Sequence, residues 1–223
     1  MTPERVVIGD AELWLGDCRE VLPGLPSVDL ILTDPPYGIG FAAQPTDYQR
    51  KNGMRPADWD NAPAPDWLMG LMQEKAGKMI VWGGNYYSLP PTRGWLSWRK
   101  PDAPPSMADF ELAWTSMDMN SKMLEQSISA TNAERVGHPT QKPLRVMAWC
   151  LSFAPDAQTV CDPFMGTGTT GVACAQLGRK FIGIERERKY FDIACRRIED
   201  AQRQASLFER VEAPAKPMQE ALL

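Results

Sequence analysis

The sequence predicts an α/β fold in which helices cover a doubly wound, mostly parallel sheet. Three observations predict it. Strand, turn and helix patterns alternate along the 223 residues, which is typical of such a sheet. The apolar run from Val28 to Leu32 leads directly into a proline-rich turn at 34–37, as expected for a buried strand. A glycine-rich turn at 163–171 lies between another short apolar run and a helix of small residues.

The elements of the first half follow from apolar runs bounded by turn residues. A strand at 12–16 precedes a short helix at 19–22, which Pro23 and Gly24 end, and the buried strand 28–33 follows. Residues 38–63 are a long polar loop, a length that is uncommon unless the loop is functional or disordered. A helix at 66–76 carries its large apolar residues on one face. A strand at 79–82, the Gly83-Gly84 turn and a further strand come next.

The second half repeats the alternation. Strands at 95–99 and 110–114 flank a proline-rich connection and are expected near the far edge of the sheet. The polar segment 116–137 has little apolar periodicity, which indicates a variable insert near the substrate face. A helix at 144–153, a strand at 160–162, a helix at 172–177, a strand at 180–184 and a long amphipathic helix at 187–202 complete the domain. We expect one catalytic domain at 1–203 and a mobile tail at 204–223.

The tetrapeptide Asp34-Pro35-Pro36-Tyr37 is the first candidate site. The exocyclic amine of a nucleobase is a poor nucleophile because its lone pair is delocalised into the ring, and hydrogen-bond acceptors withdraw it from conjugation. Asp34 can accept one amine hydrogen and the Pro35 carbonyl the other, since proline keeps its acceptor and has a fixed φ. The Tyr37 ring can stack on the base. An ordinary proline-rich turn is the alternative.

The segment from Asp162 to Gly171 is the second candidate site. Its glycines let the backbone approach a ligand closely, and the helix that follows presents unpaired amides. Glu185 ends the next strand, at the spacing where an acidic residue holds ribose hydroxyls. The pattern fits a dinucleotide and the adenosine of S-adenosylmethionine equally well, so the glycine motif leaves the cofactor open.

The order of these motifs carries a resemblance. Asp34-Pro35-Pro36-Tyr37, followed downstream by Asp162-Pro163-Phe164-x-Gly166-x-Gly168-Thr169, resembles the DNA methyltransferases that modify exocyclic amines. The tetrapeptide precedes the cofactor segment, as in the permuted subclass often called beta, and the segments at 16–18 and 138–143 are also similar to that subclass. The resemblance covers roughly residues 8 to 200. It implies a Rossmann-like fold, S-adenosylmethionine as cofactor and double-stranded DNA as partner.

The resemblance also implies which residues bind the cofactor. They lie at strand ends or in the loops beside them: Asp17, Cys18, Thr140, Lys142, Asp162, Phe164, Gly166, Gly168, Thr169 and Glu185. Glu185 would hold the ribose hydroxyls, and Thr140 and Lys142 are candidates for the methionine carboxylate. Three alternatives stay open here. Asp17 can instead cap the helix that follows it, Asp162 can instead shape its turn, and Lys142 can instead be a surface lysine.

Composition restricts the other classes of function. A hydrophobic fraction of 43% and a charged fraction of 23% are typical of a soluble globular protein. Five widely spaced cysteines and a single histidine predict a reduced, cytoplasmic chain without a metal site. The sequence shows neither a signal-peptide core nor an apolar run that could span a membrane. It also lacks the Pro-Cys pair that methylation at cytosine carbon 5 typically needs.

DNA contacts must come from local basic clusters, because the net charge is −4. Arg50, Lys51 and Arg55 are the candidates beside the site, in the loop 38–63. The segment 116–137 is short for target recognition, so the recognition sequence stays open. Either the loop shares the reading of bases, or a second subunit contributes, or the target is a few base pairs long. The subclass often dimerises, and we therefore expect a homodimer.

The sequence thus predicts transfer of a methyl group to N6 of adenine in DNA by direct attack of a flipped-out base. Adenine is favoured because adenine enzymes of this type usually carry Asp at the first tetrapeptide position, where cytosine enzymes more often carry Ser. The alternatives are an N4-cytosine methyltransferase, a methyltransferase for RNA or protein amines, a nicotinamide-dependent oxidoreductase and a silent DNA-binding module. Service in a restriction system, a phage or a solitary regulatory role also stays open.

Overall fold

The computed structural model describes residues 2–40, 43, 60–105, 107–136 and 140–212, with side chains described up to residue 205. The strands of the described residues form one sheet in the order β1-β2-β9-β8-β3-β4-β6-β5-β7. Their bounds are β1 Glu4–Ile8, β2 Ala11–Leu15, β3 Val28–Thr33, β4 Ala76–Trp82, β5 Trp95–Arg99, β6 Phe110–Thr115, β7 Lys122–Glu125, β8 Thr159–Asp162 and β9 Lys180–Glu185. The central strands β2, β9, β8, β3 and β4 run parallel, which confirms the predicted mostly parallel sheet.

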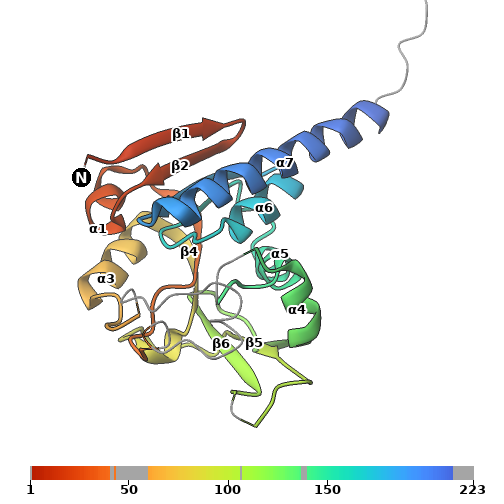
Figure 1. Cartoon of the computed structure of the whole chain (residues 1–223). Helices are drawn as coiled ribbons and strands as arrows, with labels where there is room; N and C mark the ends of the chain where they lie inside the picture. Colours follow the sequence, from red (N-terminus) through yellow and green to blue (C-terminus); the bar gives the residue numbers. More distant parts are fainter. Residues whose placement is uncertain (1, 41–42, 44–59, 106, 137–139, 213–223) are drawn as a thin grey trace, which may run out of the picture.

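Helices cover both faces of this sheet (Figure 1). The helical elements are α1 Cys18–Val21, η1 Leu22–Gly24, α3 Asp66–Lys75, η2 Gly84–Tyr86, α4 Ile128–Glu134, α5 Leu144–Leu151, α6 Thr169–Gln176 and α7 Arg188–Glu212. One apolar cluster joins the sheet to α5, α6 and α7. A second joins its other face to α1, η1 and α3. The layers are therefore those of a doubly wound α/β fold.

Strand β3 shows why the central strands read as continuous apolar runs. Leu30 and Leu32 pack in the cluster with α5 to α7, whereas Ile31 packs in the cluster with α1 and α3. All three side chains are fully buried. Successive side chains of a strand point to opposite faces of a sheet, so the part of β3 that is covered on both faces, residues 30–32, has no polar position.

Three segments differ from the sequence prediction. The segment 116–137 contains strand β7, paired with β5, and helix α4. The turn at Gly83 leads into the short helix η2 rather than into a strand. Helix α7 extends through the start of the predicted tail to Glu212 and projects beyond the sheet (Figure 1). Residues 213–223 lie outside the described residues, and no described helix is long and apolar enough to cross a membrane.

Candidate active site

The four strands that lead to Asp17, Asp34, Asp162 and Glu185 are parallel neighbours in the order β2, β9, β8 and β3. Their carboxyl ends open on one cavity of about 660 Å³, a size typical of ligand sites. Candidate residues that line it are Asp17, Cys18, Asp34, Pro35, Pro36, Tyr37, Thr140, Lys142, Asp162, Phe164, Gly166, Thr169 and Glu185. The sheet thus brings together two motifs that are more than 120 residues apart in the chain.

Both carboxylate oxygens of Asp34 are engaged. Asp34 follows β3, and its Oδ1 accepts the Tyr37 hydroxyl at 2.5 Å. Its Oδ2 accepts the Lys142 ammonium at 2.6 Å. Burial raises the pKa of Asp34 above its ordinary value, and the nearby Lys142 opposes this rise. The carboxylate therefore lies ready-oriented in the cavity, with a hydroxyl on one oxygen and a cation on the other.

The Tyr37 ring is held by the turn after β4. It stacks on Tyr86 with a centroid separation of 5.0 Å and an interplanar angle of 11°. Gly83 has a φ of 66°, and a Cβ on it would lie 2.1 Å from Cε1 of Tyr37. A side chain at position 83 would thus displace the ring. The neighbouring Tyr87 donates its hydroxyl to the Pro36 carbonyl, which fixes the tetrapeptide from the same turn.

Glu185 lies on the other side of the cavity, at the end of β9. Its Oε1 accepts the backbone N–H of Glu187 at 2.7 Å, and its own carbonyl accepts the N–H of Gly16 at 2.9 Å. Burial, together with the charge of Glu187, raises the pKa of Glu185 to about 7. A carboxylate of this kind gains from a ligand that brings hydroxyl donors to it.

The buried Asp162 carboxylate accepts hydrogen bonds from three parts of the fold: β3, the glycine-rich turn and α6. Its Oδ1 accepts the Thr33 hydroxyl at 2.7 Å and the Phe164 N–H at 3.1 Å, and its Oδ2 accepts the Thr170 hydroxyl at 2.6 Å. Only 3% of the residue is exposed, and burial raises its pKa to about 6. These contacts support the turn-shaping alternative, because β3, the glycine-rich turn and α6 all depend on them.

The glycine-rich turn lies against α7. Gly168 begins α6 with a φ of 77°, and a Cβ there would lie 2.9 Å from Cβ of Ala194. Gly168 is thus needed for the packing of the turn on α7 and does not line the cavity. Arg197, also on α7, donates to the carbonyl of Thr167 at 2.6 Å and to the hydroxyl of Thr169 at 3.2 Å. Sequence reasoning missed Arg197.

Asp17 caps the helix that follows it. Its Oδ1 accepts the Arg19 N–H at 2.9 Å, and the Arg19 guanidinium forks onto both carboxylate oxygens. The capping alternative is therefore present in the structure, and a role toward the adenine ring stays a prediction. Cys18 is buried in the same turn, where burial raises its thiol pKa to about 12.

The segment before α5 also faces the cavity. Thr140 lines it. The buried Gln141 accepts the Thr167 hydroxyl at 3.2 Å and the Val136 N–H at 3.1 Å, which ties this segment to the glycine-rich turn. Sequence reasoning assigned no role to Gln141. His138 lies outside the described residues.

Lys142 lies at the Asp34 end of the cavity. Its side chain is 6% exposed, and its ammonium pairs with both Asp34 and Glu111. The predicted contact with a methionine carboxylate stays a prediction. Glu111 is a further residue that sequence reasoning missed. Arg50, Lys51 and Arg55, predicted to contact DNA, lie outside the described residues.

The comparisons with known proteins point the same way as the geometry. A family model described as DNA methylase (N6_N4_Mtase) matches residues 96–196. The type II methyltransferase M.HinfI of Haemophilus influenzae is 29% identical over 222 residues, which is 92% of this chain and 55% of the relative. The chain thus spans about half the length of that relative.

Solved structures extend the likeness to the fold. The M1.HpyAVI–SAM complex superposes with a TM-score of 0.53 at 25% identity, over 84% of this chain and 99% of that one. The PvuII DNA methyltransferase, described as cytosine-N4-specific, has a TM-score of 0.57 at 17% identity, over 92% and 93% of the two chains. At that identity the second likeness concerns the fold alone.

Fold and site together resemble those of Rossmann-like methyltransferases, here with a permuted motif order. The acceptor tetrapeptide after β3 and the glycine-rich turn after β8 share one cavity, and the matched family model covers the segment from β5 to α7. The chain is thus similar to the N6/N4 family of DNA methylases over the segment that this family model matches.

Proposed function

We propose that this chain transfers the methyl group of S-adenosylmethionine to the exocyclic N6 of adenine in double-stranded DNA. One observation carries the proposal: the Asp34 carboxylate and the carboxylate of Glu185 line the same cavity, at the carboxyl ends of neighbouring parallel strands. A base amine beside Asp34 and a cofactor ribose beside Glu185 would therefore share one enclosed space.

The residues beside Glu185 fit the proposed cofactor. Glu185 accepts hydrogen bonds from the backbone of Glu187 and of Gly166, and a carboxylate with two oxygens can still accept ribose hydroxyls. Phe164 and Gly166 provide an apolar ring and exposed backbone on the same wall. Asp17, Cys18, Thr140 and Thr169 complete the lining. When bound, S-adenosylmethionine supplies a methyl group on a positively charged sulfur, which departs as a neutral thioether.

The Asp34 end of the cavity fits the amine. The amine displaces the Tyr37 hydroxyl from Oδ1 of Asp34 and donates one hydrogen to this oxygen and the other to the Pro35 carbonyl. Both contacts would localise the nitrogen lone pair, which would then bond to the methyl group as that group leaves the sulfur. The positive charge that develops on nitrogen is stabilised by Asp34. The surplus proton of the nitrogen then leaves to solvent.

Adenine is proposed over cytosine on the strength of Asp34, because Asp at this position is usual in the adenine enzymes that the chain resembles. The two bases present similar amines, so the acceptor geometry serves both. Plasmid methylated by the protein should yield N6-methyladenine when it is digested to nucleosides and resolved by mass spectrometry. N4-methylcytosine without N6-methyladenine would overturn the base assignment, and neither product on any duplex DNA would overturn the function.

We also propose that Arg50, Lys51 and Arg55 contact DNA phosphates at the mouth of the cavity. Helix α4, in the segment 116–137, also contributes to this side of the cavity, because Ile128 and Thr131 line it. This supports the prediction that the segment lies near the substrate. Replacing the three basic residues with Gln should weaken every duplex alike and reduce the salt dependence of binding. If DNA affinity and its salt dependence are unchanged in this variant, the DNA-binding surface lies elsewhere on the protein.

We also propose that the chain forms a homodimer and that residues 1–203 form a single domain. Light scattering coupled to gel filtration should give twice the chain mass of 24.9 kDa at micromolar concentration. A strict monomer would contradict the dimer.

A further inference from the structure

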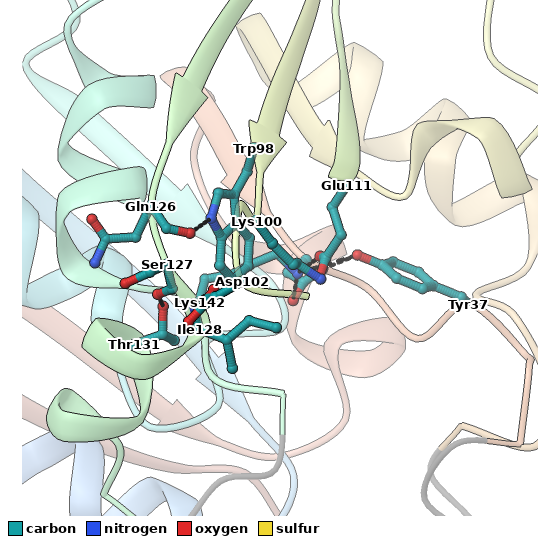
Figure 2. A network of polar contacts seen from close by, with 11 residues as sticks. Tyr37, Trp98, Lys100, Asp102, Glu111, Gln126, Ser127, Ile128, Thr131 and Lys142 are labelled. Atoms are coloured by element: carbon teal, nitrogen blue, oxygen red, sulfur yellow. Dashed lines mark hydrogen bonds and ion pairs between the residues drawn. The ribbon is translucent and has the colours of Figure 1, made fainter. Parts of the chain in front are cut away.

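A largely buried array of four charges adjoins the cavity at its Asp34 end. Figure 2 labels three of them, Lys142, Glu111 and Lys100. Asp34 follows β3, Glu111 lies on β6, Lys100 follows β5, and Lys142 precedes α5. Lys142 Nζ lies 2.6 Å from Oδ2 of Asp34 and 3.0 Å from Oε2 of Glu111. Lys100 pairs with the other oxygen of Glu111. Two carboxylates and two ammonium groups thus alternate in one chain of contacts.

Every donor of Lys142 is used within this array. An ammonium group has three N–H donors, and Lys142 Nζ contacts Asp34, Glu111 and the Tyr37 hydroxyl, the last at 3.2 Å. A cofactor carboxylate would have to break one of these contacts in a nearly buried site. Lys142 therefore belongs to the base end of the cavity rather than to the cofactor end.

The charges stabilise one another against burial. Burial alone would lower the pKa of Lys142, but the carboxylates of Asp34 and Glu111 outweigh it and raise that pKa. Burial alone would raise the pKa of Glu111, but Lys142 and Lys100 outweigh it and lower that pKa to about 2. Both groups are consequently charged at neutral pH. A buried charge is retained only where it is paired.

Glu111 is itself held by Lys100, which follows β5 near the edge of the sheet. Lys100 Nζ lies 4.7 Å from the centre of the Trp98 ring, and its side chain is only 10% exposed. Trp98 Nε1 donates to the Gln126 carbonyl at 2.8 Å, just before α4 (Figure 2). The array thus connects β5, β6 and the α4 segment to the carboxylate of Asp34.

We propose that Glu111 and Lys142 are positioning residues that orient Asp34 for the base amine. Lys142 holds Oδ2 of Asp34, Glu111 holds Lys142, and the remaining oxygen, now covered by the Tyr37 hydroxyl, is the one that receives the amine. The proposal rests on the proposed function. It assigns the fixed contact of Asp34 to Lys142 and the exchangeable one to Tyr37.

The test compares Glu111→Gln and Lys142→Met with Lys78→Met as matched control. Lys78 forms an ion pair with Asp156 at 2.5 Å on β4, away from the cavity. Each protein is assayed for methyl transfer to duplex DNA at saturating cofactor, and its cofactor affinity is measured by calorimetric titration without DNA. We expect kcat to fall about 10- to 150-fold in each of the two variants, because each loses one hydrogen bond to a charged group. The dissociation constant of S-adenosylmethionine should stay within about twofold.

A double variant separates positioning from general loss of stability. If Glu111 acts through Lys142, the Glu111→Gln/Lys142→Met enzyme should have the same kcat as Lys142→Met alone, whereas independent effects would multiply. If Lys142→Met does not fold, Glu111→Gln and Lys100→Met test the same array from its outer end, with the same expected split between kcat and cofactor affinity.

The contrary outcomes are distinct. Wild-type kcat in Glu111→Gln, or cofactor affinity lowered tenfold or more in Lys142→Met, would overturn the positioning role while the wild-type enzyme stays active. A wild-type protein that methylates no duplex DNA would instead overturn the proposed function, whatever the variants do. The cofactor titration of Lys142→Met decides between its two assignments even then, because it needs no DNA.

Discussion

The two ends of the active-site cavity place carboxylates in opposite surroundings. At the cofactor end, Asp162 and Glu185 are met by hydroxyl and amide donors, and burial raises their pKa values to about 6 and 7. At the base end, Asp34 and Glu111 contact ammonium groups, and the pKa of Glu111 falls to about 2. The base end thus contains the cations that balance its carboxylates. At the cofactor end, the carboxylate of Glu185 would be stabilised further by hydrogen-bond donors of a ligand.

The largest effect is expected at the base end. Asp34→Ala removes the acceptor for the amine and leaves Lys142 without one of its two carboxylates. Methyl transfer should fall by at least about 10²-fold, the scale for losing one preorganised electrostatic contact. Calorimetry should find cofactor affinity nearly intact. A matched loss of cofactor affinity would mean that the two ends are not independent.

The second effect concerns the cofactor end. Glu185→Ala removes the acceptor proposed for the ribose hydroxyls, and the loss of hydrogen bonds to a charged group costs about 1.5–3 kcal/mol. The dissociation constant of the cofactor should rise about 10- to 150-fold, with duplex affinity unchanged. Unchanged cofactor affinity in calorimetric titration would remove Glu185 from the site.

The third effect is structural. Asp162→Ala leaves the buried Thr33 and Thr170 hydroxyls without their acceptor, which costs about 1–3 kcal/mol of unfolding free energy. The melting temperature should fall by about 2–10 °C. Asp29→Ala is a matched control, because Asp29 also bridges β3 to β8 but at the exposed end of the sheet. An equal or larger loss in the control would show that Asp162 contributes little.

The smallest effect is a dependence of cofactor affinity on pH. The pKa of Glu185 is raised to about 7, so its ionised fraction grows as pH rises from 6 to 8. The ionised form is the better acceptor for hydroxyls, and affinity should therefore rise about tenfold over this range. Glu185→Gln should flatten the profile. A profile that falls with pH, or that keeps its slope in the variant, would assign the titration to another group.

Local patterns predicted the strands and the turn of the cofactor end, whereas the ion pairs of the base end leave no local pattern in the sequence. A strand, a glycine turn and an acidic residue at a strand end can each be recognised from a few neighbouring residues. The elements β8, α6 and β9 lie where these patterns predict them. Glu111 lies in an apolar strand as one acidic residue among Phe, Leu and Trp. Nothing near it in the chain indicates that Lys142, which lies just before α5, will pair with it.

The segments where prediction failed have physical reasons of their own. Helix α4 lacks a broad apolar face, and it is stabilised by polar caps, since Asp102 accepts the N–H groups of Ile128 and Ser129. Asp102 is distant in sequence, so the helix leaves little local signal. Helix α7 meets no proline before Pro214, so good helix formers continue it past the last residue that contacts the sheet.

The permuted strand order has a consequence for synthesis of the chain. Strands β8 and β9 are made last, yet they sit between β2 and β3 at the centre of the sheet. A nascent chain that ends after β7 therefore presents the edges of β2 and β3 without their partners, and such edges invite pairing with other chains. Contacts across about 130 residues also slow folding. The cavity between Asp34 and Glu185 is complete only once β9 has left the ribosome. Until then, Asp34 lies beside an open gap in the sheet.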